Sequence, residues 1–214
     1  MSEDFPLQNL LAGRLRAGVI VYRGVAPRPG ASLRERIAAE TTALRAAAAG
    51  APAPGFELAR RLYRSFGVDP TKHRPSSEAL WRRLRDRGDF PAVNPAVDLT
   101  NLLSLRYQVC YGLYDLDRLQ PPLAIDLGRE GDAYQGIRKD VLNLAGRIVV
   151  RDSQGAFGNP SADSLRASVS ASSRGILQVL FFHPQDPRQR EIVSASASAF
   201  AEFFFAAECR SFIT

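Results

Sequence analysis

Four polar residues lie close together in one short stretch: Asn94, Asp98, Thr100 and Asn101. Asp98 and Asn101 are three residues apart, so on a helix they share one face near its positive N-terminal end. A carboxylate at that end can simply accept hydrogen bonds from backbone N–H groups, and we expect this of Asp98. A mid-helix amide offers a donor and an acceptor together, which suits orienting a water or a carbonyl. Asn101 is therefore the first candidate for a chemical role.

A second candidate segment is 155–160, with the sequence GAFGNP. Its glycines predict a tight turn that exposes backbone amides, a plausible cradle for an anion or a carbonyl oxygen. The common catalytic signatures are missing, because the chain has no Gly-rich phosphate loop, no GxSxG, no HExxH and no CxxC. We therefore expect neither a cofactor nor a bound metal.

The other reactive side chains are isolated in the sequence. His73 lies in a basic loop and His183 follows an apolar run, so both are more typical of structural or surface histidines than of catalytic ones. Cys110 would need a base nearby to act as a nucleophile, and neither histidine is close to it in sequence. Two cysteines far apart, Cys110 and Cys209, do not make a disulfide framework.

The composition is that of an ordinary globular protein. The chain has 214 residues, of which 45% are apolar and 23% charged. It contains no run of about 18 apolar residues, and its start, MSEDFPLQNL, lacks the basic-then-apolar order of a signal peptide. These features predict a cytoplasmic protein with reduced thiols and no membrane association.

The net charge of +6 is distributed unevenly. The segment 60–106 contains ten Lys or Arg against five Asp or Glu. Two interpretations stay open for this excess: a solvated helix face, or a surface that meets a polyanion such as a nucleic acid.

The pattern of apolar residues and breaks predicts a helix-rich first half and a strand-rich second half. The expected elements are a short helix over 5–14, a strand ending at Val25, helices over 32–49, 56–66 and 75–87, a helix starting at Asn94-Pro95, strands over 123–127, 147–151 and 177–182, and a C-terminal helix over 191–209 packed on the sheet. This order favours an α+β fold over a doubly wound parallel sheet.

Within 74–117 the sequence resembles a known family. The matching residues run in order: Pro75-Ser76, Leu80-Trp81, Arg82-Arg83, Val93-Asn94, the segment VDLTN at 97–101, and YDLD at 114–117. They resemble the B3/B4 domain of the bacterial phenylalanyl-tRNA synthetase β subunit, most closely its free-standing relatives. The resemblance covers roughly 62–182, so we expect one domain over 1–214, with an N-terminal annex over 1–61 and a C-terminal helix after 182.

The resemblance implies a mixed or antiparallel sheet with flanking helices and a cleft between two halves. In the synthetase that cleft hydrolyses tyrosine wrongly attached to the tRNA for phenylalanine. The family's pocket asparagine falls on Asn101, with Thr100 beside it, and Gly112 stands where the family has a pocket histidine. The acidic residue of the family pocket falls in 158–163, on Asp163, or on Ser168 by strict alignment.

Two functions follow from these observations. The first is trans-editing: hydrolysis of the ester in a mischarged aminoacyl-tRNA, without synthetase activity since the catalytic core for charging is absent. The second is a non-catalytic module that binds RNA or an amino-acid-like molecule in the same cleft. Under the first, Asn101 and Thr100 are catalytic and backbone amides near Gly158 hold the oxyanion. The expected substrate-binding residues are Asn94, Gly112, Gly158, Asn159, Asp163 and Ser168, and the expected tRNA phosphate contacts are Arg74, Arg82, Arg83, Arg85 and Arg87.

Overall fold

A computed structural model describes residues 7–30, 32–48, 56–137 and 140–214. Its centre is a four-stranded antiparallel sheet in the order β12-β2-β10-β4, in which the last strand of the chain pairs with the second. These strands are β12 (Glu208–Ile213), β2 (Arg16–Arg23), β10 (Gly175–Phe182) and β4 (Cys110–Asp115). The interior of β2 and all of β10 are buried, which explains their continuous apolar runs GVIVY and ILQVLFF.

A second sheet covers one face of the central sheet. Its strands are β1 (Leu7–Asn9), β5 (Leu123–Leu127), β8 (Ile148–Asp152) and β9 (Gly155–Gly158), in that order. The pairing is mixed, because β1 runs parallel to β5 while the other pairs are antiparallel. Ile125 and Val150 from this sheet pack against Val19 and Leu177 from the central one, so a core of apolar side chains fills the space between the sheets.

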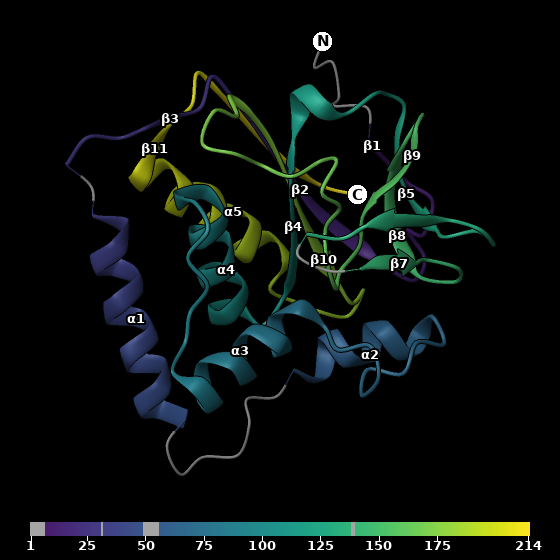
Figure 1. The fold of residues 1–214 in the computed structure, drawn as a ribbon, viewed down its shortest axis with the longest axis horizontal. Helices are drawn as coiled ribbons and strands as arrows, with labels where there is room; N and C mark the ends of the chain where they lie inside the picture. The colour runs from purple at the N-terminus through teal and green to yellow at the C-terminus, as the bar shows by residue number, and fades with distance from the viewer. Residues whose placement is uncertain (1–6, 31, 49–55, 138–139) are drawn as a thin grey trace.

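Two helices cover the opposite face of the central sheet. These are α4 (Pro95–Tyr107) and α5 (Gln189–Phe203), and Figure 1 shows them together beside β4 and β2. Leu99 of α4 and Phe200 of α5 share a second core with Ile20 and Leu180. The central sheet is therefore buried on both faces, between a smaller sheet and a helical layer.

Three further helices complete the structure: two pack against the helical layer, and one packs through Leu62 and Tyr63 against the core between the sheets. They are α1 (Leu33–Ala48), α2 (Glu57–Ser65) and α3 (Ser76–Arg87). Phe56, Trp81, Leu84 and Leu105 form a separate apolar cluster that joins α2, α3 and α4. Gly88 ends α3 in the left-handed conformation, with φ of 66°, as expected for a glycine after a helix.

The remaining elements are short. They are β3 (Ala26–Pro27) paired with β11 (Phe204–Phe205), β6 (Ala133–Gln135) paired with β7 (Val141–Asn143), and the 3₁₀ turn η1 (Leu116–Arg118). In the part of the chain that the structure covers, no helix has the length and apolar character needed to cross a bilayer.

The predicted α+β class is confirmed, as are the helices predicted over 56–66 and 75–87 and from Asn94. The helix over 32–49 is confirmed as α1, where Ser32 Oγ accepts from Glu35 N at 3.3 Å. The predicted last residue of this helix, Ala49, lies outside the described residues. The three predicted strands are present as β5, β8 and β10, and the strand ending at Val25 is β2.

Three predictions were wrong in the described residues. Residues 7–9 form a strand rather than part of a helix, since Leu7 is buried between the sheets and pairs with Leu123. The C-terminal helix ends at Phe203, because the following residues pair as β11 and β12. The segment 155–158 is strand β9, paired with β8, rather than a turn that exposes its amides.

Candidate active-site cleft

A cleft of about 360 Å³ lies between the helical layer and the segment that follows β9. This volume falls within the usual range of small-molecule sites. Its lining comes from α3, α4, β4, one residue after β6 and the segment 159–163: Ser76, Ala79, Leu80, Arg83, Asn101, Ser104, Tyr111, Ile137, Asn159, Ser161, Ala162 and Asp163. The predicted residues Asn101, Asn159 and Asp163 are therefore brought together here, although 62 positions separate the first from the last.

Asn101 reaches the cleft from the middle of α4. It is half-buried, and its side-chain amide makes no hydrogen bond within the part of the chain that the structure describes. Ser104, one turn later, also lines the cleft, but its hydroxyl donates to Val109 O at 2.7 Å. Asn101 thus keeps both its donor and its acceptor available to a ligand.

Thr100 has a different position from the one that a catalytic role needs. Its side chain is buried on the sheet side of α4, where Oγ1 donates to Ala96 O at 2.9 Å and accepts from Gln178 Nε2 at 3.1 Å. Gln178 Oε1 accepts in turn from Tyr22 at 3.4 Å. Thr100 does not line the cleft. Its hydroxyl stabilises the contact between α4 and the central sheet.

Four of the predicted binding residues also lie outside the cleft lining: Asn94, Gly112, Gly158 and Ser168. Asn94 caps α4, since its Oδ1 accepts from Val97 N at 3.0 Å and its Nδ2 donates to Val169 O at 3.2 Å. Ser168 Oγ donates to Leu165 O at 2.9 Å. Asp98 accepts from Val93 N at 2.8 Å, which confirms the expectation that it binds backbone donors.

Asn159 has a fixed orientation at one wall of the cleft. Its Oδ1 accepts from two backbone groups, Ser161 N at 2.7 Å and Ala162 N at 3.0 Å. An oxygen must therefore occupy this position, and the other end of the amide is the Nδ2 donor. The residue is only 3% exposed, and Nδ2 has no hydrogen-bond partner among the described residues.

The first turn of α3 lies directly against this segment. The backbone N–H of Ser76 donates to Pro160 O at 3.2 Å. The hydroxyl of Ser76 is buried and, within the described residues, has no hydrogen-bond partner. Ser76 and Asn159, each with a buried polar group that has no partner among the described residues, thus line the same cleft.

Asp163 is held by backbone groups on both sides. Its Oδ2 accepts from Leu113 N at 3.2 Å, and its carbonyl accepts from Ile137 N at 3.1 Å. Burial and the negative charge of Asp163 raise the pKa of Tyr114 well above its ordinary value. The phenol of Tyr114 is therefore neutral at physiological pH.

Gly112 and Gly158 leave room for the side chain of Tyr114. A Cβ added at Gly112 would lie 2.0 Å from the Tyr114 hydroxyl oxygen, and one added at Gly158 would lie 2.1 Å from it. The ring also packs edge-on against Phe157, with centroids 4.9 Å apart. A tyrosine side chain thus fills the space that a larger residue at Gly112 would need.

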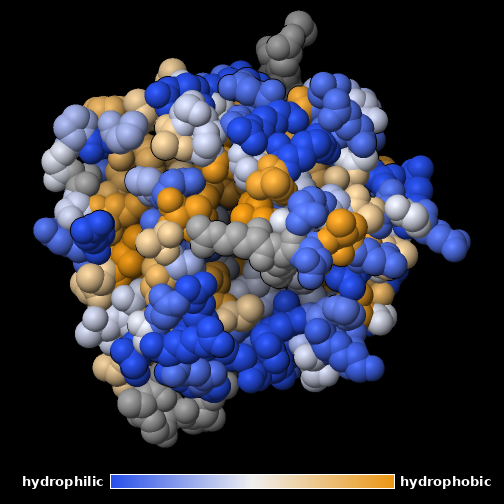
Figure 2. Space-filling model, in the orientation of Figure 1, coloured by the Kyte–Doolittle hydropathy of each residue, from blue (hydrophilic) through white to orange (hydrophobic). Residues whose placement is uncertain are grey.

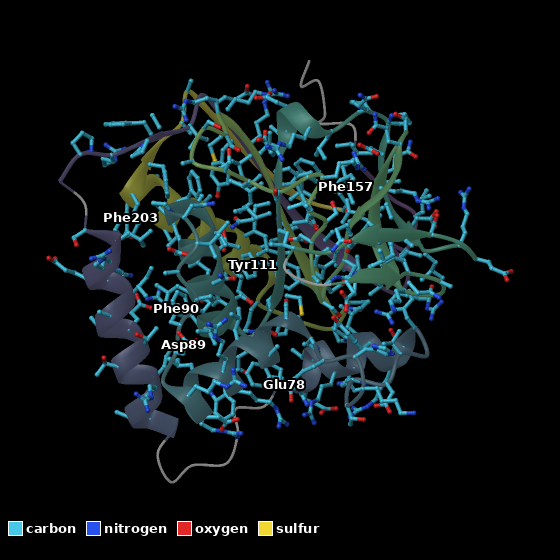
Figure 3. All side chains as sticks on the ribbon, viewed as in Figure 1. Glu78, Asp89, Phe90, Tyr111, Phe157 and Phe203 are labelled. Atoms are coloured by element: carbon cyan, nitrogen blue, oxygen red, sulfur yellow. The ribbon has the colours of Figure 1, made fainter. Side chains whose placement is uncertain are left out.

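The basic helix α3 is partly neutralised by its own neighbours. Glu78, 2% exposed, accepts from Arg60 Nη2 at 2.7 Å and from Arg82 Nε at 3.0 Å, with Arg74 Nε at 3.7 Å. Figure 3 shows Glu78 at the meeting of α2 and α3. Burial alone would raise the pKa of Glu78, but the hydrogen bonds from Arg60 and Arg82 outweigh it and hold the pKa below its usual value.

The other three arginines of α3 lie on its exposed side. Arg83 Nε donates to Asp89 at 2.7 Å, and Arg85 Nε donates to Asp86 at 2.5 Å. Arg87 makes no ion pair within the described residues. Hydrophilic residues cover the surface over α2 and α3 in Figure 2. Of the five arginines predicted to bind phosphate, Arg83 lines the cleft itself.

Of the described residues that line the cleft, none is a histidine or a cysteine. His73 borders a separate small cavity, where burial and Arg147 lower its pKa. Cys110 is buried, with Ser77 Oγ 3.8 Å from its sulfur. The residues that sequence reasoning missed are Ser76, Ser104, Tyr111, Ser161 and Ile137. Only Ser104 had a usable signal, since it follows Asn101 by one helical turn.

One comparison with known proteins shows the family of the chain. A comparison with curated proteins found no match. A solved structure, an N-terminal fragment of the phenylalanyl-tRNA synthetase β-subunit from Pyrococcus horikoshii, is 11% identical, with a TM-score of 0.41. The similarity covers 57% of this chain and 43% of that fragment, so the match spans less than half of the fragment's length. A family model for the B3/4 domain matches residues 58–202, more than half of the chain. The chain therefore belongs to the B3/4 domain family.

Proposed function

We propose that the cleft hydrolyses the ester between an amino acid and the terminal adenosine of a mischarged tRNA. The observation that carries this proposal is the position of Asn101. The family resemblance gives this residue to the editing pocket, and here it lines a cleft with no hydrogen bond to its amide in the described part of the chain.

The reaction needs no strong nucleophile, because an aminoacyl ester is already labile. A water oxygen attacks the carbonyl carbon, the bond to the ribose oxygen breaks, and that oxygen takes a proton from the water. The products are a free amino acid and a tRNA with a free terminal hydroxyl. A site that positions the water and stabilises the charge on the carbonyl oxygen is sufficient. Asn101 supplies the positioning, while Thr100, whose hydroxyl is engaged with Ala96 and Gln178, takes no direct part.

Phosphates of the tRNA are bound by the exposed side of α3. Arg83 is 42% exposed and its partner Asp89 is 48% exposed, and such surface pairs are worth about 0–1 kcal/mol, so a phosphate can replace the carboxylate. Arg87 extends the same surface. Arg74 and Arg82 contribute less, because Glu78 holds them.

One observation favours the second candidate, a non-catalytic module that binds RNA or an amino-acid-like molecule. No histidine or cysteine is found among the described residues that line the cleft, so no side chain of those types can act there as a base or nucleophile. The two functions differ in whether an ester is cleaved.

A deacylation assay separates them. Purified protein is incubated with a panel of mischarged aminoacyl-tRNAs, and the remaining ester is measured against time, with Asn101→Ala as the comparison. Hydrolysis by the wild type that falls at least about 100-fold in Asn101→Ala supports editing. Absence of hydrolysis across the panel, with tRNA binding retained, would leave the binding module as the function.

A further inference from the structure

Two residues that line the cleft carry a buried polar group for which the described part of the chain offers no partner. These are Asn159 Nδ2 and Ser76 Oγ. Buried polar groups in folded proteins are nearly always hydrogen-bonded, and an unpaired one costs roughly 1–3 kcal/mol. The bond from Ser76 N to Pro160 O, the residue after Asn159, brings these two groups to the same part of the cleft, so one ligand atom that bonds to both would satisfy both.

The chemistry of the two groups identifies that ligand atom. Asn159 Oδ1 already accepts from Ser161 N and Ala162 N, so Nδ2 can only donate. Ser76 has a hydroxyl that can donate as well. A ligand atom that bonds to both donors must be an acceptor, and a carbonyl or carboxylate oxygen has two lone pairs for this purpose.

The place of Ser76 in the fold adds a favourable charge. Ser76 is the first residue of α3, a helix of twelve residues, so the positive end of the helix dipole points to this part of the cleft. The bond from Ser76 N to Pro160 O keeps α3 and the segment with Asn159 in contact. Negative charge on a ligand oxygen is thus stabilised by two donors and by the dipole together.

We propose that Asn159 Nδ2 and the Ser76 hydroxyl form the seat for the substrate's carbonyl oxygen and stabilise the negative charge that develops on it during hydrolysis. This proposal adds the oxyanion donors to the proposed function, and its catalytic part rests on that function. It also replaces the backbone amides near Gly158 as the oxyanion donors, because that segment is paired in β9. The same seat binds a carboxylate oxygen of the free amino acid after hydrolysis.

The sharpest variant is Asn159→Asp. An aspartate keeps the oxygen that accepts from Ser161 N and Ala162 N, so the local fold is retained, and it replaces only the Nδ2 donor by an acceptor. The matched control is Asn143→Asp, which makes the same chemical change at an exposed asparagine outside the cleft, where Oδ1 accepts from Ala145 N at 2.9 Å. Thermal unfolding of both variants verifies that they fold.

Kinetics of deacylation test the catalytic part. Loss of one oxyanion donor costs about 10²–10³-fold in kcat. We expect Asn159→Asp to lower kcat at least about 100-fold with KM within about threefold, Ser76→Ala to lower it about tenfold, and Asn143→Asp to leave it unchanged. Wild-type kcat in folded Asn159→Asp would overturn the assignment.

Binding of free amino acids and of acetate, measured by calorimetry, tests the seat even if no tRNA is hydrolysed. Wild-type binding that is lost in Asn159→Asp and retained in Asn143→Asp supports the seat, whatever the outcome for hydrolysis. Equal binding by the wild type and Asn159→Asp, or no binding by the wild type, would overturn it. A failure of editing alone is recognised by wild-type binding without hydrolysis.

Discussion

The backbone N–H of Ser76 donates to the carbonyl of Pro160 at 3.2 Å. This single bond joins the first turn of α3 to the segment that follows β9, two parts of the chain separated by more than 80 positions. It brings Ser76 and Asn159, which both line the cleft, close together. The geometry of the site therefore depends on how α3 is anchored.

Glu78 provides that anchor, and its removal should destabilise the protein. Glu78→Gln removes the carboxylate that accepts from Arg60 and Arg82 in a nearly buried position. Since the arginines are partly exposed, we expect a loss of roughly 2 kcal/mol in the free energy of unfolding, measured by urea denaturation. The control is Asp89→Asn, at an exposed pair, which should change stability by less than about 0.5 kcal/mol. Equal effects of the two substitutions would contradict this account of Glu78.

Stability should fall in acid, and the sign follows from the lowered pKa values. Burial opposes the shift, but arginine partners hold the pKa values of Glu78 and Asp152 below their usual range. A carboxylate with a lowered folded-state pKa stabilises the protein above its unfolded pKa, about 4, and this contribution is lost as the pH falls through the folded value. We expect the free energy of unfolding to decrease below about pH 4, and to decrease less steeply in Glu78→Gln. A wild-type protein equally stable at pH 3 and pH 7 would be inconsistent with these carboxylates.

Gly158 should tolerate no side chain. Gly158→Ala would place a Cβ 2.1 Å from the hydroxyl and 2.4 Å from the ring of buried Tyr114, so the ring or the strand must move. We expect a loss of roughly 2–3 kcal/mol in stability. Gly13→Ala is the control, because a Cβ there meets nothing within 4 Å. Thermal denaturation compares the two variants, and a Gly158→Ala protein as stable as Gly13→Ala would show that the packing around Tyr114 is looser than described.

Binding of tRNA should weaken with salt and depend on the exposed arginines. Each phosphate contact steepens the dependence of log K on log salt by about 0.7–0.9. We expect Arg83→Ala and Arg87→Ala each to reduce the slope of log K against log salt by about the value for one phosphate contact. Fluorescence anisotropy of tRNA binding measures this slope. Arg61→Ala, which removes a hydrogen bond to Gln185 away from α3, should leave the slope unchanged. An unaltered slope in the double variant Arg83→Ala/Arg87→Ala would show that these residues of α3 do not contact phosphates.

The sequence was sufficient to predict the α+β class and the part of the site that lies within one helix. Asn101 could be singled out because an amide in mid-helix has few structural reasons to be there. Its neighbour Thr100 could not be separated from it by sequence, because only the three-dimensional position of Gln178 shows that the threonine hydroxyl is already engaged.

The remaining parts of the site depend on tertiary contacts. Ser76 was visible as a helix start and as part of the family match Pro75-Ser76, but its relation to Asn159 requires α3 to meet the segment after β9. The glycines of 155–158 suggested a turn, but pairing with β8 makes this segment a strand. Likewise, the small residues and phenylalanines after 203 favoured a helix in the sequence. In the structure this segment includes β12, which pairs with β2 at the edge of the central sheet.

The central claim is that the cleft hydrolyses an aminoacyl ester through Asn101 rather than through its neighbour. The most direct test is single-turnover deacylation of one mischarged tRNA by three proteins: wild type, Asn101→Ala and Thr100→Val. Thr100→Val removes the hydrogen bonds to Ala96 and Gln178, so it should cost about 1–2 kcal/mol of stability but keep the hydrolysis rate within about threefold of the wild type. The account predicts a loss of at least about 100-fold in Asn101→Ala alone. A full rate in Asn101→Ala, or a greater loss in folded Thr100→Val, would contradict it.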